Sequence, residues 1–158
     1  MVNILSGSQM VEIGIQIEKN GRDFYNTLAR QSENQRARSI FKFLAGEEEK
    51  HIEVFKKILG TVENYGSAES YPGEYLAYMA DLAGEYVFTQ KEKGEEAALA
   101  IKSEKEAVDK GIGFEKDSIV FYEGMKKAVP EQALGVLDAL IKQEESHFRQ
   151  LVELKKML

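Results

Sequence analysis

The chain contains an internal repeat. Residues 14–25 (GIQIEKNGRDFY) align without a gap on residues 111–122 (GIGFEKDSIVFY), and at nearly the same offset residues 44–51 (LAGEEEKH) align on residues 140–147 (LIKQEESH). A repeat of this kind indicates two copies of one structural unit, each of which needs a neighbour to cover its apolar face. At 158 residues the chain is long enough for a single domain, 1–158, built from two such units, 6–59 and 103–157.

Each unit has the pattern of a helical hairpin. Ser6 and Ser103 are followed three residues later by Gln or Glu, the capping box that satisfies free backbone groups at a helix start. We expect helices over about residues 6–31 and 34–59, a third from about Ser103 that ends before Pro130, and a fourth that continues from there nearly to Leu158. Gly60 should end the second helix, and Pro130 suits the first turn of the fourth. The abundance of Glu, Lys, Ala and Leu is typical of such a chain. The sequence therefore predicts an all-α protein made of two repeated hairpins.

Residues 60–102 belong to neither repeat. Turn-forming residues concentrate at 66–73, and the apolar residues of 75–87 then recur at helical spacing. Two hairpins related by a two-fold axis leave the second helix ending, and the third beginning, at opposite ends of a bundle. A helix of about 25 residues is about 38 Å long, which a short turn cannot span. We therefore expect a long crossover that carries one or two short helices.

Charged residues interrupt the apolar seam of all four predicted helices. Along each seam, in alternating steps of three and four, the middle positions hold glutamates and the chain's two histidines instead of apolar residues: Glu18, Glu48, His51, Glu115, Glu144 and His147. Four carboxylates in an apolar interior repel one another and lose their hydration, which is costly without counter-charges. Two divalent cations would cancel the charge. Carboxylate with imidazole suits iron or manganese, whereas zinc takes such ligands at lower coordination number.

Further residues on these seams have a predicted role beside the metals. Tyr25 and Tyr122 each lie seven positions after a glutamate of the seam. We expect each to donate a hydrogen bond to a ligand carboxylate on a facing helix, with simple core packing as the alternative. Gly21 and Ser118 are small, and their positions predict open space beside the metals.

Charge and composition exclude several other classes. The net charge of −6, with acidic residues spread along the chain, argues against a nucleic-acid surface. The absence of cysteine removes disulfides, thiolate metal sites and iron–sulfur clusters. No apolar run approaches the roughly 20 residues that span a bilayer, and no targeting pattern opens the chain. We therefore expect a cytoplasmic protein without membrane or nucleic-acid partners.

The ordered pattern of glutamates and histidines resembles the ferritin-like superfamily, and the local sequence is most similar to its rubrerythrin branch. The resemblance lies in EKNGRDFY (18–25), EEKH (48–51), EKDSIVFY (115–122) and EESH (144–147), so it covers both hairpins and not the crossover. It implies a ferritin-like four-helix bundle that holds two iron ions. The implied roles are bridging for Glu48 and Glu144, terminal for Glu18 and Glu115, and one metal each for His51 and His147.

Two departures from the rubrerythrin pattern qualify the function that it implies. Rubrerythrins proper end in a rubredoxin domain with cysteine-bound iron, and this chain has no cysteine. They also carry an extra glutamate three residues after the third-helix ligand, where Ser118 stands here. The resemblance still implies a non-haem di-iron oxidoreductase that reduces hydrogen peroxide or dioxygen, supplied with electrons by an external redox protein.

Three alternatives remain open from the sequence. They are iron binding or storage without turnover, a di-manganese protein resembling a catalase, and a structural bundle whose site is a relic. We also expect a homodimer, because the apolar, tyrosine-rich crossover could cover a bundle face or exchange between subunits.

Overall fold

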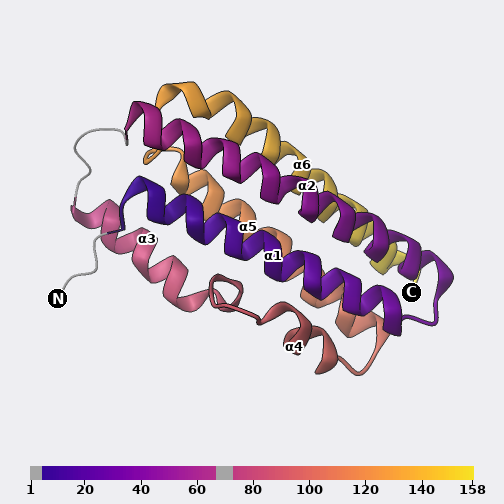
Figure 1. Cartoon of the computed structure of the whole chain (residues 1–158). Coiled ribbons are helices and arrows are strands. Elements are labelled where there is room, and N and C mark those ends of the chain that lie inside the picture. Colours follow the sequence, from indigo (N-terminus) through magenta and orange to yellow (C-terminus); the bar gives the residue numbers. More distant parts are fainter. Residues whose placement is uncertain (1–4, 67–72) are drawn as a thin grey trace.

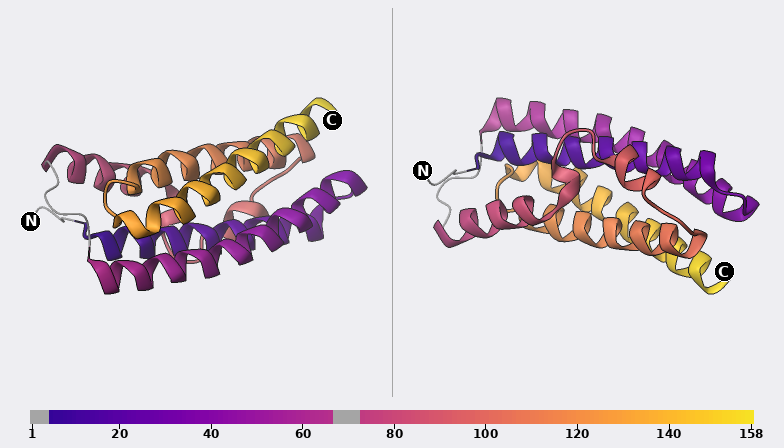
Figure 2. Two further views of the ribbon diagram at one scale, coloured as in Figure 1. Left: turned by 90° about the horizontal axis from the view of Figure 1, so that it is seen from above. Right: turned by 90° about the horizontal axis from the view of Figure 1, so that it is seen from below.

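Four long helices form a bundle in the computed structural model, which describes residues 5–66 and 73–158 (Figure 1). Helices α1 (Gly7–Gln31) and α2 (Gln35–Tyr65) make the first hairpin, and α5 (Glu104–Met125) and α6 (Glu131–Lys156) make the second. The hairpins lie against each other as two layers, with α2 contacting α6 and α1 contacting α5 (Figure 2). The predicted all-α bundle of two hairpins is thus confirmed. None of the described helices is long and apolar enough to cross a membrane.

The helix starts follow from local hydrogen bonds. Ser6 Oγ accepts from the backbone N–H of Gln9, and Gln9 Oε1 accepts from the N–H of Ser6, so the first capping box is complete. Ser103 Oγ likewise accepts from the N–H of Glu106. The Glu106 carboxylate, however, accepts from the N–H of Lys102. Both serines therefore begin a helix, but in the second capping box the glutamate accepts from the backbone of Lys102, the residue before the N-cap, and not from the N-cap itself.

Two predicted helix boundaries, the end of α2 and the start of α6, are corrected by the structure. Gly60 lies inside α2, which continues to Tyr65 because its apolar face extends to the buried Val62. Gly66 ends the helix instead, with a φ of 79° that favours glycine. Helix α5 ends at Met125, before Pro130 as predicted, whereas Pro130 precedes α6 as its N-cap residue and lies outside the first turn.

The crossover carries two helices and a short 3₁₀ turn. They are α3 (Gly73–Glu85), η1 (Val87–Thr89) and α4 (Gly94–Leu99). Helix α3 packs on α5, whereas η1 and α4 pack on α1, so the crossover runs along the face that α1 and α5 form together (Figures 1 and 2). Most of the predicted turn at 66–73 lies outside the described residues.

A single buried side chain fastens the crossover to α1. Asn20 Nδ2 donates to the carbonyl oxygens of Phe88 and Gln90, each at 2.6 Å. Asn20 Oδ1 accepts from the N–H groups of Lys93 and Gly94 at 3.0 and 3.1 Å. Helix α4 approaches so closely here that any Cβ at Gly94 would overlap the carbonyl group of Asn20. The crossover is thereby held beside the middle of the bundle, two residues from Glu18.

Candidate metal centre

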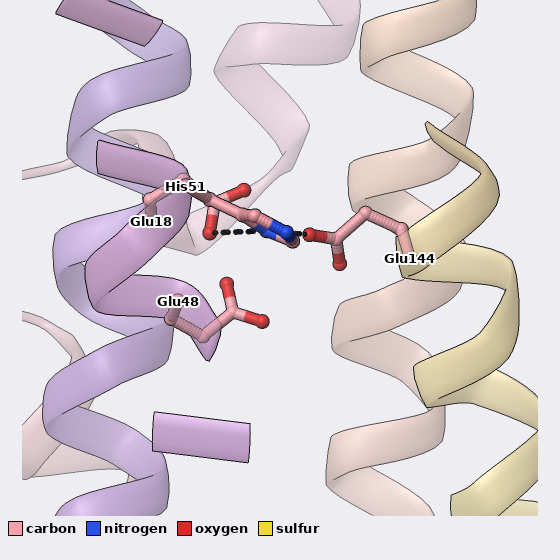
Figure 3. Close-up of side chains that lie close together, drawn as sticks. All are labelled: Glu18, Glu48, His51 and Glu144. Carbon is pink, nitrogen blue, oxygen red and sulfur yellow. Dashed lines mark ion pairs between the residues drawn. The ribbon is translucent and has the colours of Figure 1, made fainter. Parts of the chain in front are cut away.

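The six charged residues of the seams converge at the centre of the bundle. Their side chains are all buried, and they form two groups in which the candidate ligand atoms lie within 4.8 Å of one another. The groups share two glutamates, one from each hairpin. Their members are Glu18, Glu48, His51 and Glu144 in one group, and Glu48, Glu115, Glu144 and His147 in the other. Figure 3 shows the first group, with side chains from α1, α2 and α6 directed at one point.

Each histidine faces carboxylates from both hairpins. His51 Nδ1 lies 2.6 Å from Glu144 Oε1 and 3.5 Å from Glu18 Oε2. His147 Nδ1 lies 3.6 Å from Glu48 Oε1 and 3.8 Å from Glu144 Oε2. The two imidazole rings are stacked, with centroids 5.5 Å apart. The spacing of three residues places the glutamate and histidine of each motif on one helix face, about one turn apart.

Many side-chain oxygen and nitrogen atoms of the site have no hydrogen-bond partner in the described part of the chain and are available to coordinate a metal. Among the described residues, eight buried side-chain nitrogen and oxygen atoms have no hydrogen-bond partner, and all eight belong to these six side chains. The short contact between His51 Nδ1 and Glu144 Oε1 is therefore one of proximity only, without hydrogen-bond geometry. Buried polar atoms without partners are rare in folded proteins, and each costs about 1–3 kcal/mol. Carboxylate oxygens and imidazole nitrogens in this arrangement fit a pair of divalent cations.

The distribution of these atoms separates the glutamates into two kinds. Glu48 and Glu144 have both oxygens without partners, whereas Glu18 and Glu115 have only one each. The remaining oxygen of Glu115 accepts from Tyr25 at 2.8 Å, and that of Glu18 accepts from Tyr122 at 2.7 Å. Two glutamates therefore have both oxygens free to bridge two metals, and two have one.

The tyrosines link the hairpins in a reciprocal way. Tyr25 on α1 donates to the carboxylate on α5, and Tyr122 on α5 donates to the carboxylate on α1. Burial, followed by the neighbouring carboxylates, raises the pKa of both phenols well above the usual value. Both tyrosines are therefore neutral donors in fixed positions.

The electrostatics of the cluster favour added positive charge. Burial and the charges of Glu144 and Glu18 raise the pKa of Glu48 well above its usual value, and burial with Glu144 does the same for Glu115. Burial opposes ionisation of Glu144 as well, but its contacts with Glu115 and both histidines hold its pKa below the usual value. Burial by itself lowers the pKa of His51, but the charges of Glu18 and Glu144 outweigh it and raise that pKa to about 11. Without metal, the cluster retains protons in place of cations.

The open space predicted beside the metals is filled in the structure. A Cβ at Gly21 would overlap the ring of Phe114 and lie 3.1 Å from Glu48 Oε2, so the glycine admits a ring and leaves no void. Ser118 is buried and donates to the carbonyl oxygen of Phe114 at 2.8 Å. Tyr86, from the crossover, lies with its hydroxyl 3.1 Å from Ser118 Oγ.

Sequence reasoning missed three residues that touch or frame the site. They are Gln143, which contacts His51, Tyr86, which contacts Ser118, and Asn20, which anchors the crossover. Gln143 adjoins a predicted ligand, but its direction on α6 depends on packing against α2. The crossover has no repeat partner, so no alignment within the chain singles out Tyr86.

Known proteins are similar to this chain in sequence profile and in fold. The family model described as Rubrerythrin matches residues 9–155. A Thermotoga maritima protein, whose crystal structure is classed as that of a ferritin-like diiron-carboxylate protein, has a TM-score of 0.70 and 24% sequence identity. That alignment covers 99% of this chain and 98% of the other, and at such an identity it shows the shared fold. No curated protein matches the sequence.

Proposed function

The chain belongs to the rubrerythrin family, and on that premise we propose that it is a non-haem di-iron oxidoreductase that reduces hydrogen peroxide or dioxygen. The observation that supports this most strongly is a set of eight buried side-chain oxygen and nitrogen atoms in one site, none of which has a hydrogen-bond partner among the described residues. Without bound cations, burying these six polar side chains inside an apolar bundle would cost free energy and give no compensating interaction. Family membership favours iron over manganese.

The two groups of side chains define which residues would hold which metal. Glu48 and Glu144, with both oxygens free, would bridge the two ions. Glu18 with His51, and Glu115 with His147, would complete one position each. When bound, two ferrous ions supply the two electrons that, together with two protons, convert hydrogen peroxide into two molecules of water.

The chain's own residues prepare this site in three ways. Tyr25 and Tyr122 hold the terminal carboxylates by hydrogen bonds, so that one oxygen of each stays directed inward. The buried bundle interior limits access of bulk water. Phe114 packs over Gly21 against the site, which further restricts space for large substrates. With no cysteine to hold a second iron centre, an external redox protein is the proposed electron donor.

The proposal is tested by rapid mixing of the anaerobic, ferrous protein with hydrogen peroxide. We expect fast iron oxidation with one peroxide consumed per two irons and no release of dioxygen. Glu144→Ala should lose at least one equivalent of bound iron together with the fast phase. Glu145→Ala, its exposed neighbour on α6, is the matched control and should behave as the unmodified protein.

Other outcomes of the same experiments would replace the proposal. Oxidation no faster than that of ferrous ion in buffer would remove the enzymatic claim. Release of dioxygen from peroxide by protein purified with manganese would favour a catalase-like activity. Uptake of many irons per chain into a large assembly would favour storage.

A further inference from the structure

The outer nitrogen atoms of the two histidines have different surroundings. His51 Nε2 lies 2.6 Å from Gln143 Oε1, a contact from α6 to α2. The His147 ring, in contrast, lies in a T-shaped arrangement with the exposed Phe43 ring, with centroids 6.3 Å apart and the planes at 87°. No hydrogen bond to His147 Nε2 is found among the described residues.

The contact from Gln143 determines which nitrogen of His51 faces the metals. An amide oxygen only accepts hydrogen bonds, so His51 Nε2 carries the proton and donates. The other nitrogen, Nδ1, is the one that faces Glu144 and Glu18. A metal-binding imidazole generally donates its second N–H to an acceptor, and this fixes both its tautomer and its ring orientation.

The internal repeat makes this contact a difference between two otherwise matched positions. Gln143 precedes the histidine of its own helix by four residues, and Glu47 holds the equivalent place on α2. The Glu47 carboxylate pairs with Lys50 at 3.5 Å, one turn along the same helix. The two hairpins therefore have the same candidate ligands at equivalent positions, but only His51 has a side-chain hydrogen bond to its outer nitrogen among the described residues.

We propose that Gln143 is a positioning residue that holds His51 with Nδ1 toward the site and makes the His51 metal position the tighter of the two. The inference rests on the metal site of the proposed function, but not on its chemistry. Loss of an outer hydrogen bond to a metal ligand typically weakens metal affinity by about 10–100-fold. Gln143 is exposed, so its replacement leaves the core intact.

The test compares Gln143→Leu with Glu47→Leu by anaerobic titration of the metal-free proteins with Co²⁺, followed by calorimetry and visible absorption. We expect Gln143→Leu to weaken one of two equivalents by about 10–100-fold and to change its absorption bands. Glu47→Leu should change neither equivalent. Gln143→Leu keeps a side chain of similar volume but has no acceptor, whereas Gln143→Glu keeps an acceptor and should restore the affinity.

Three results would overturn the inference. They are unchanged affinity in Gln143→Leu, equal weakening by Glu47→Leu, or failure of Gln143→Glu to restore binding. A protein that binds Co²⁺ as described but does not react with peroxide would refute the proposed function and leave this inference intact. Absence of Co²⁺ binding by the unmodified protein would refute both.

Discussion

Replacing Asn20 by alanine removes four hydrogen bonds between α1 and the crossover in one step. The side chain donates to the carbonyl oxygens of Phe88 and Gln90 and accepts from the N–H groups of Lys93 and Gly94. A neutral hydrogen bond contributes about 1 kcal/mol net, so the four together contribute about 4 kcal/mol. If the crossover detaches, its freed groups regain water and the loss is smaller. We therefore expect the free energy of unfolding to fall by about 2–4 kcal/mol.

Urea unfolding of the metal-free protein, followed by far-ultraviolet circular dichroism, measures this loss. Asp117 is the matched control, because it occupies the equivalent repeat position on α5 and is exposed. Asp117→Ala should cost less than about 0.5 kcal/mol. Asn20→Asp keeps the acceptor but loses both donated bonds, so it should be destabilised too. Faster hydrogen exchange at the Lys93 and Gly94 amides would place the effect in the crossover. A loss in Asn20→Ala no larger than in Asp117→Ala would refute the reasoning.

Two further perturbations test the packing and the charge of the site. Gly21→Ala should displace the Phe114 ring and lower the free energy of unfolding by about 1–3 kcal/mol. Gly113→Ala, where a Cβ meets open space, is the control and should be neutral or stabilising by up to about 1 kcal/mol. Equal stability of the two variants in thermal unfolding would contradict this reasoning. The pKa values of His51, at about 11, and of Glu48 are raised in the folded, metal-free protein, so their stabilising effect is present at low pH and is lost as pH rises. Urea unfolding of the metal-free protein should therefore show a stability that falls from about pH 5 to about pH 9. Over the same range the affinity for metal should rise, because the ligand side chains must lose protons to bind it. A metal-free stability that stays constant would show that the cluster does not retain protons.

The sequence was sufficient to predict the bundle and the position of the six glutamate and histidine side chains at its centre. Helical periodicity decides which face of a helix is buried, and the repeat shows that the same face is interrupted twice in the same way. A charged residue at a seam position of a packed bundle is therefore expected to point into the interior. The structure places Glu18 and Glu115, from different hairpins, in two adjoining groups that share Glu48 and Glu144, as that reasoning requires.

Features that depend on contacts between elements could not be predicted in this way. The glycine at position 60 carries the same local signal as a helix end, but the buried Val62 beyond it keeps α2 helical. Gly21 was expected to leave a void, and only the packed structure reveals that the ring of Phe114 enters there. Asn20 has no local signature, because its partners lie about 70 residues away.

Each candidate metal position draws its donors from both hairpins, and this has a mechanical consequence. Three of the four residues in each group come from one hairpin and the fourth from the other. An ion at either position would therefore tie together segments far apart along the chain, as a disulfide does in proteins that contain cysteine. In this cysteine-free chain, ions bound at these positions would act as cross-links, so their removal would weaken the association between the two hairpins.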